Sequence, residues 1–175
     1  MTKSEAQQLL TEYIDNPALR RHCEMVAQAM EAYATKLGEN SEDWYIAGLL
    51  HDLDWEKYPD EHPNKACDEI LPAHGISDEI LDAIRAHAPA RTGKQPETNI
   101  EKYLFACDEI SGFMDAVAKV HPGRFEGMKW SSVKKKLKNK AFAAAVPRED
   151  IESGAKLIGV PLSEHVTFLI SVFQQ

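Results

Sequence analysis

The apolar residues of this chain recur at intervals of three and four, and this spacing constrains the fold more than any other feature. In residues 17–38 the side chains of Leu19, Val26, Met30 and Leu37 fall in one line when the segment is wound as an α-helix. An Asn-Pro pair precedes this stretch and a glycine closes it, as is typical of helix ends. No long segment alternates polar and apolar residues as a half-buried strand would. The chain is therefore predicted to be all-α.

Further helices follow from the same spacing and from capping residues. A pairing of Ser4 with Gln7 suggests a capping box that opens a first short helix, and Ser41 is predicted to cap another. Prolines and a glycine predict loops at 54–63, 88–97 and 121–127. The other predicted helices are 41–51, 63–71, 77–87, 98–120, a short basic helix from Ser131, 148–158 and 162–173.

Length and composition limit the class of protein. A chain of 175 residues with 43% hydrophobic content suits one domain with its own core, and we expect a single compact multi-helix domain over residues 1–175. The sequence shows no internal repeat and no obvious linker. Its three cysteines have no CxxC spacing, which favours reduced thiols packed in the core.

Charge and hydropathy exclude several partners. The net charge of −8 argues against a long nucleic acid, and no stretch approaches the length of a membrane span. The polar N-terminus lacks the features of a signal peptide, so we expect a cytoplasmic protein. The sequence leaves open whether the chain forms a homo-oligomer. A small phosphorylated substrate held by a few local cations remains compatible with the acidic balance.

Ionisable residues gather where apolar side chains would be expected. The stretch "GLLHDLDWEKYPDEHP" ends an apolar run with a His-Asp pair, and such groups are costly to bury unless something pairs with them. Imidazoles and carboxylates on other inward faces complete a candidate ligand set suited to Mn, Fe, Zn or Mg. A carboxylate at a helix end can also bridge two ions. The set is His22, His51, Asp52, His62, His87 and Asp108.

The order of these residues carries a family resemblance. The pattern H…HD…D, with the segments "EHPNKACDEI", "ILDAIRAHAPARTG" and "IEKYLFACDEI", resembles the HD-domain metal-dependent phosphohydrolase superfamily. In particular it resembles bacterial HD hydrolases with six protein ligands and two metals. The resemblance covers about residues 18–115. It implies an HD-type domain with a metal site between helices, on which the helices of 131–173 would pack.

The resemblance also implies roles by position. His22, His51, Asp52 and Asp108 would hold a first metal, and His62 and His87 a second, with Asp52 bridging. His51 and Asp52 would form the catalytic centre. The expected cofactor is one or two divalent ions among Fe, Mn, Zn, Ni, Co and Mg. Related diadenosine-polyphosphate hydrolases usually carry a lysine soon after the HD pair, where this chain has Asp54 and Trp55, so the substrate stays open.

Other polar residues are candidates for a supporting role at the site. Lys57, Arg91 and Lys94 are candidates for binding the remaining phosphate oxygens. Asp54 and Glu61 either orient ligand imidazoles or form an acidic surface loop, and the second interpretation is favoured. The other histidines (His74, His121 and His165) are expected to be structural or exposed. The basic run "KKKLKNK" is expected to be a solvated helix face.

These observations favour a metal-dependent phosphohydrolase that cleaves an ester or anhydride of a small phosphorylated compound, with a nucleotide as the expected substrate. The expected mechanism is attack of metal-bound hydroxide on phosphorus. Two alternatives remain open from the sequence. One is an HD-fold di-iron oxygenase with a similar ligand set, and the other is a non-catalytic, metal-stabilised ligand-binding module.

Overall fold

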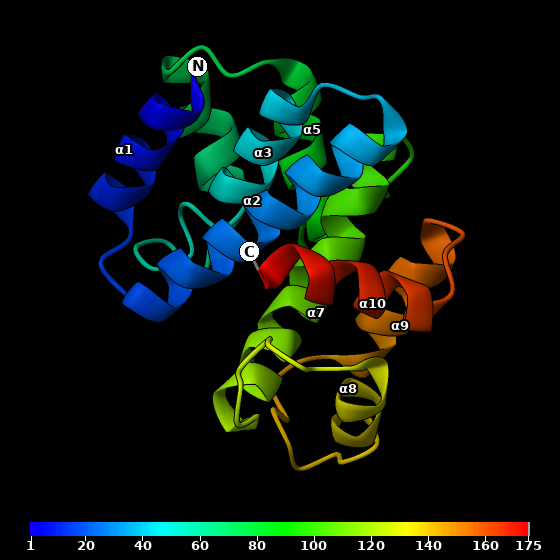
Figure 1. Ribbon diagram of the computed structural model, residues 1–175. Coiled ribbons are helices and arrows are strands. Elements are labelled where there is room, and N and C mark those ends of the chain that lie inside the picture. The colour runs from blue at the N-terminus through cyan, green and yellow to red at the C-terminus, as the bar shows by residue number, and fades with distance from the viewer. Residues whose placement is uncertain (175) are drawn as a thin grey trace.

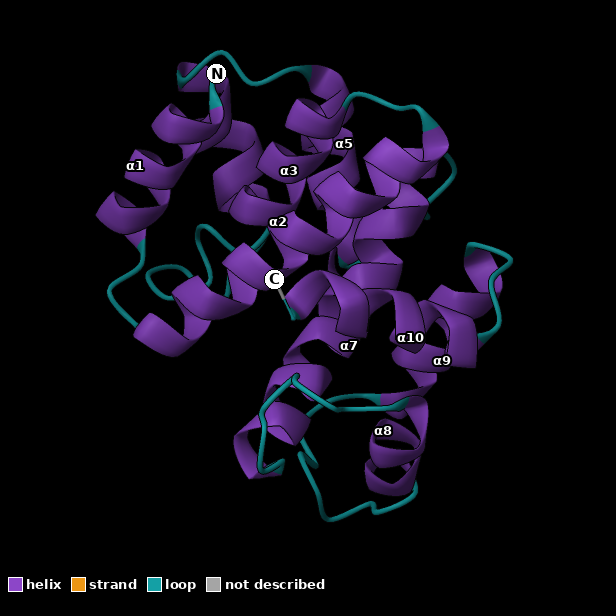
Figure 2. Cartoon of the chain, viewed as in Figure 1, coloured by secondary structure: helices purple, strands orange, loops and turns teal. Residues whose placement is uncertain are grey.

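The computed structural model describes residues 1–174, so the last residue of the predicted domain, Gln175, lies outside the described residues. The described part contains helices and loops but no strand (Figure 2), which confirms the all-α prediction. A π-helical segment, η1, spans Ala66–Ile70. The α-helices are α1 (Lys3–Tyr13), α2 (Pro17–Leu37), α3 (Ser41–Leu50), α4 (Leu71–Ala73), α5 (Asp78–His87), α6 (Pro89–Thr92), α7 (Asn99–Val120), α8 (Trp130–Leu137), α9 (Arg148–Leu157) and α10 (Leu162–Phe173).

Four helices form the centre of the molecule. Helix α2 packs on α3 and on α7, and α5 packs on both α3 and α7 (Figure 1). Helix α1 covers α3 from outside, while α9 lies against α7 and α10 against α2. The predicted apolar line of α2 faces this core, since Val26 and Met30 are completely buried. The C-terminal helices therefore extend the core that the central four helices build.

The crossing of α2 and α3 is unusually close because of a glycine. A Cβ atom on Gly48 would lie 2.8 Å from the Cα atom of Ala27, a distance that real side chains do not tolerate. With glycine at this position the two helix backbones touch directly. The crossing fixes how α2, which carries His22, meets the end of α3, which carries His51.

Two helix starts differ from prediction by a residue or two. The capping box of α1 pairs Thr2 with Glu5 rather than Ser4 with Gln7: the Thr2 hydroxyl accepts from the Glu5 amide at 3.3 Å, and the Glu5 carboxylate accepts from the Thr2 amide at 2.7 Å. Helix α3 is capped by Asn40, whose side chain accepts from two amides of the first turn. In each case a better acceptor stands just upstream of the predicted cap.

The segments 63–71 and 88–97 differ from their predicted helix and loop. The helix predicted for 63–71 includes the π-helical segment, and there the Ala66 amide donates to the Asp54 carboxylate at 2.8 Å. That contact occupies an amide which a regular helix would pair with a carbonyl of the preceding turn. The predicted loop at 88–97 contains the short helix α6, which begins at Pro89 and ends at Gly93 in the left-handed conformation.

The cysteines, the start of α8 and the hydropathy of the helices were also predicted from the sequence. The three cysteines are buried free thiols, as expected for reduced residues packed in the core. Helix α8 begins at Trp130, one residue before the predicted start. Within residues 1–174 no single helix is long and apolar enough to cross a membrane. Helices α9 and α10 satisfy length and hydropathy only as a pair bent by 95°.

Candidate metal centre

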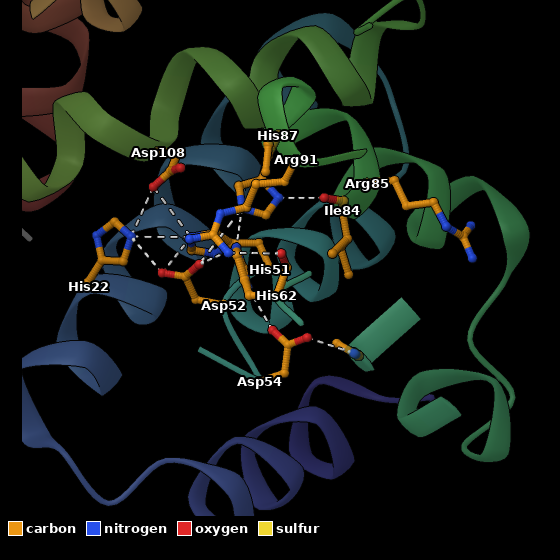
Figure 3. A network of polar contacts seen from close by, with 12 residues as sticks. His22, His51, Asp52, Asp54, His62, Ile84, Arg85, His87, Arg91 and Asp108 are labelled. Atoms are coloured by element: carbon orange, nitrogen blue, oxygen red, sulfur yellow. Dashed lines mark hydrogen bonds and ion pairs between the residues drawn. The ribbon is translucent and has the colours of Figure 1, made fainter. Parts of the chain in front are cut away.

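Six side chains from five separate segments converge at the centre of the four-helix core (Figure 3). His22 comes from the second turn of α2, and His51 and Asp52 come from the C-terminal end of α3. His62 lies in the turn before η1, His87 is the last residue of α5, and Asp108 lies in the middle of α7. The structure thus brings together all six of the residues that the sequence predicted as ligands.

One half of the cluster is formed by His22, His51 and Asp108 with one oxygen of Asp52. The Nε2 atom of His22 lies 3.0 Å from Oδ1 of Asp108 and 3.2 Å from Nε2 of His51. Nε2 of His51 lies 3.4 Å from the same Asp108 oxygen. Oδ2 of Asp52 completes the group, at 3.7 Å from His22 and 3.5 Å from His51. The ligand atoms of His22, His51 and Asp108 all lie within 4.8 Å of one another, and so do those of His51, Asp52 and His87.

The second half is formed by His62 and His87 with the other oxygen of Asp52. The two Nε2 atoms lie 3.2 Å apart. Oδ1 of Asp52 is 3.5 Å from Nε2 of His62 and 3.8 Å from Nε2 of His87. Asp52 thus directs one carboxylate oxygen to each half, which is the arrangement of a bridging carboxylate between two ions.

The far sides of three rings are held by hydrogen-bond acceptors. Nδ1 of His51 donates to the Gly48 carbonyl at 2.8 Å, and Nδ1 of His87 donates to the Ile84 carbonyl. Nδ1 of His62 donates to Oδ1 of Asp54 at 2.7 Å. A neutral imidazole that donates from Nδ1 presents a lone pair on Nε2. These partners therefore turn the metal-binding face of each ring toward the cluster, as outer contacts of metal sites commonly do.

The electrostatics of the cluster reflect an excess of carboxylate. Burial opposes a charge on the His51 ring, but Asp52 and Asp108 outweigh it and raise the pKa of His51 to about 9. Burial and then the neighbouring His51 lower the pKa of His87 to about 4. Burial acts against ionisation of Asp108 as well, yet His51 and His22 hold its pKa well below the usual range. A proton on His51 thus neutralises part of the buried negative charge.

The donor set fits a divalent cation. Lone pairs that face each other across 3.2 Å, as in the two Nε2–Nε2 contacts, repel unless a proton or a cation stands between them. Four imidazoles and two carboxylates are the ligand types of Mn, Fe, Zn, Co and Ni sites. A cation in each half would satisfy both the facing lone pairs and the carboxylate excess. The residues present therefore fit one or two divalent ions, and the ligand roles remain a prediction.

The cluster forms the floor of a pocket of about 400 Å³. The pocket is also lined by Trp55, by the segment 88–91, by Phe105 and Glu109 from α7, and by Asp150 from α9. Asp52 and the rings of His22, His62 and His87 are reached from the same space. A small ligand in this pocket would therefore contact the candidate metal ligands directly.

Of the three predicted substrate-binding cations, only Arg91 lines the pocket. Its guanidinium donates to the Pro59 carbonyl at 2.7 Å and lies 5.0 Å from the centre of the Trp55 ring. Lys57 instead donates to the Glu12 carbonyl at 2.8 Å and lies over Tyr13. Lys94 pairs with Glu101 at 3.2 Å. The structure does not bring Lys57 and Lys94 to the site, because carbonyl and carboxylate acceptors nearer to each lysine hold it on the surface.

Three acids have a larger place in the site than the sequence suggested. Asp54, favoured as a surface acid, is completely buried and connects His62 to the Ala66 amide. Burial first, then Asp108 and Asp150, raise the pKa of Glu109 to about 8. Burial, Glu149 and Asp108 also raise the pKa of Asp150. Glu109 could have been suspected as the direct neighbour of Asp108, but Asp150 lies 42 positions beyond that residue and has no motif.

The three remaining histidines lie outside this pocket. His74 is exposed, and His121 is a half-buried residue at the C-terminal end of α7. His165 is completely buried between α10, α2 and α7, with hydrogen bonds at both ring nitrogens. Their positions agree with the prediction of structural or surface roles.

Comparison with known proteins supports the resemblance seen in the sequence. The HD domain family model matches residues 19–112, which is more than half of the chain. This protein therefore belongs to the HD domain family, whose members are mostly metal-dependent phosphohydrolases. No curated protein and no solved structure matches the chain significantly. The match contains the six convergent residues and ends well before α9.

Proposed function

We propose that this protein is a metal-dependent phosphohydrolase that cleaves an ester or anhydride of a small phosphorylated compound. The observation that carries the proposal is the division of the cluster at Asp52, with one oxygen directed to each half at the floor of a pocket. Membership of the HD domain family supports the same reaction class. A nucleotide is one candidate substrate, since Trp55 offers an aromatic face at the pocket wall.

His22, His51, Asp52 and Asp108 would hold one ion, and His62, His87 and Asp52 a second. When bound, such ions activate water and neutralise charge on phosphoryl oxygens. The Gly48 carbonyl, the Ile84 carbonyl and Asp54 keep three imidazoles in the required tautomer. Because the rings are fixed before any ligand arrives, little reorganisation is needed during the reaction.

Arg91 supplies positive charge outside the cluster. Its stacking on Trp55 and its bonds to backbone carbonyls hold the guanidinium at the pocket edge. From there it can donate to a phosphate oxygen that faces away from the cluster. Phosphoryl transfer depends mainly on such positioning and charge neutralisation, with little covalent help from the protein.

The test is a metal analysis followed by a substrate panel. Protein purified without added ions is expected to carry one or two equivalents of a first-row divalent metal. Supplied with Mn, Fe, Co, Ni, Zn or Mg, it should release phosphate from at least one nucleotide or simple phosphate ester. The variant Asp108→Asn should lose this activity, and Asp60→Asn, at an exposed loop acid, should keep it.

Two outcomes would contradict the proposal. One is metal-loaded protein that turns over no phosphate compound with any of these ions. The other is iron-dependent oxygen uptake on substrate addition without phosphate release, which would indicate an oxygenase.

A further inference from the structure

The pocket has an acidic wall that hydrolysis of a phosphate does not require. This acidic wall consists of Glu109 on α7 and Asp150 on α9, both half-buried and both facing the pocket. They belong to the site already described and form no separate site. Their position is unexpected because a phosphate group is repelled by carboxylates. The acidic wall should therefore meet a different part of the substrate.

A close contact between α9 and α7 positions Asp150 at the pocket. Gly154, one helical turn after Asp150, lies so near Ala106 that a Cβ atom would come within 2.7 Å of the Ala106 Cα atom. Ile151 and Ala155 are buried at the same interface. The backbone of α9 thus has a fixed distance from α7, and Asp150 has a fixed place beside Glu109. Helix α9, which carries Asp150, lies outside the residues that the HD domain model matches, whereas Glu109 lies within them.

The acidic wall lacks a neutralising partner among residues 1–174. Neither Glu109 nor Asp150 makes an ion pair or a side-chain hydrogen bond there, whereas the buried acid Asp115 pairs with arginine and lysine. The charged groups nearest to Glu109 include Asp108, Asp150 and Asp52, which repel it, and His51, which attracts it. Lys57 and Lys94 are held elsewhere. The pocket therefore has one cationic wall, at Arg91, and one acidic wall.

We infer that the acidic wall selects a substrate that carries a protonated amine in addition to its phosphate. This inference rests on the proposed function, because it assumes that the phosphate binds at the metal cluster. The amine would lie between the carboxylates of Asp150 and Glu109 while the phosphate faces the cluster and Arg91. Asp150 is then a specificity-determining residue that recognises the leaving part of the substrate.

An amine is favoured over a hydroxyl group by charge. A hydroxyl can donate to one carboxylate but leaves the repulsion between the two acids unchanged. An ammonium group donates to both and offsets one unit of their negative charge, and charge-assisted hydrogen bonds are about twice as strong as neutral ones. The pocket volume of about 400 Å³ suits a compound of this size.

The test uses three phosphate esters that differ in one terminal group. They are 2-aminoethyl, 2-hydroxyethyl and propyl phosphate, with nitrogen, oxygen and carbon at the same position of the chain. Their dissociation constants are measured on manganese-loaded protein by calorimetry, and phosphate release is followed in parallel. We expect the amine ester to bind about tenfold or more tightly than the other two, the effect of one charge-assisted hydrogen bond.

Substitutions on α9 test whether the acidic wall produces the preference for the amine ester. Asp150→Asn should remove most of the preference for the amine ester and should not weaken binding of propyl phosphate, since the change removes a carboxylate that repels phosphate. Glu152→Gln is the matched control, since it changes the same charge on an exposed position of α9 and should keep the preference. Gly154→Ala should weaken the preference without changing any charge, because it moves α9 away from α7.

Three results would overturn the inference: equal affinity for the three esters, the same preference in Asp150→Asn as in the wild type, or loss of bound manganese in Asp150→Asn. The last would place the acid in the metal centre. Failure of the proposed function has a different signature. In that case none of the esters is hydrolysed, while the binding comparison still decides whether the wall selects an amine.

Discussion

Two groups of buried histidines in this molecule have opposite environments. His165 has a protein partner at each nitrogen: Tyr33 donates its hydroxyl to Nδ1 at 2.6 Å, and Nε2 donates to the Ala106 carbonyl at 3.0 Å. In His51 and His87 the Nδ1 atom donates to a backbone carbonyl, and the Nε2 atom faces the other imidazoles and carboxylates of the cluster. Burial alone therefore does not mark a metal ligand. The distinguishing feature is an Nε2 atom that faces other imidazoles and carboxylates instead of a single backbone or hydroxyl partner.

The two groups also differ in charge. Burial lowers the pKa of His165 to about 4, so this ring is neutral in the folded protein. The Asp52 and Asp108 carboxylates overcome the same burial at His51 and raise its pKa to about 9. The surroundings of His165 thus exclude charge, and Asp52 and Asp108 attract positive charge to His51, whereas His87 in the same centre is neutral because burial and His51 lower its pKa to about 4. The predictions below separate the two regions experimentally.

The largest effect is expected from Asp52, the carboxylate that directs one oxygen to each half of the cluster. Asp52→Asn keeps the shape of the side chain but removes the charge shared by both halves of the cluster. Phosphate release should fall by about 1,000-fold, which corresponds to about 4 kcal/mol of transition-state stabilisation. Steady-state kinetics measure the loss, with metal content determined on the same sample. Unchanged activity together with full metal content would refute the bridging role.

The pH dependence of folding stability should show that the surroundings of His165 exclude charge. The folded pKa of His165, about 4, lies below its unfolded value of 6.5, so the unfolded chain binds the extra proton between these values. Stability from this residue is complete above pH 6.5 and is lost as the pH falls toward 4, by about 3 kcal/mol in total. Urea unfolding of metal-free protein between pH 7 and pH 4 measures the change.

The control is His165→Gln, whose amide can still donate to the Ala106 carbonyl and accept from Tyr33. The variant should show a flatter pH dependence than the wild type over the same range. Parallel pH curves for the two proteins would mean that His165 does not carry the effect.

Removal of the metal should lower the thermal stability of the protein through the candidate metal centre. An ion that binds only the folded state stabilises it by about 2.7 kcal/mol at 100 times its dissociation constant. For a chain of this length, chelation should then lower the melting temperature by about 5 to 10 °C. Differential scanning calorimetry with and without a chelator tests this, and Asp108→Asn should show a smaller shift. No shift after verified removal of the metal would contradict the assignment of the centre.

Loss of a residue that orients a candidate ligand should have an intermediate effect on metal affinity and activity. Asp54→Asn weakens the bond that orients His62, and changes of this kind commonly cost 10- to 100-fold in metal affinity or activity. The expected result is a loss within that range, with weaker retention of the ion near His62 and His87. A metal titration resolves the two halves. Equal weakening of both ions would show that Asp54 supports the fold generally.

The smallest effect concerns the predicted substrate-binding cations. Arg91→Gln should raise KM about tenfold, the effect of about 1.4 kcal/mol of binding. Lys57→Gln and Lys94→Gln should leave KM unchanged, since neither lysine lines the pocket. A larger KM effect from either lysine than from Arg91 would show that the loops rearrange when substrate binds.

How far the sequence could predict this molecule depends on the range of the interactions involved. The position of His22 follows from helical spacing within α2, and the order of the six residues indicates the family. Lys57 and Lys94 could not be placed, because exposed lysines pair with whichever acceptor the folded surface brings near. Asp150 reaches the pocket only through the contact of Gly154 with Ala106, and such tertiary contacts leave no local pattern.

Gly48 has a consequence for anyone who wishes to transfer this centre to another protein. Its missing side chain sets the distance between α2 and α3, and its carbonyl holds the His51 ring. A designer who grafts the six ligands onto another helical scaffold without this crossing would obtain the right donors at the wrong spacing. Transfer of the centre therefore requires this pair of touching helices, which carries His22, His51 and Asp52, together with the segments that supply the other three candidate ligands.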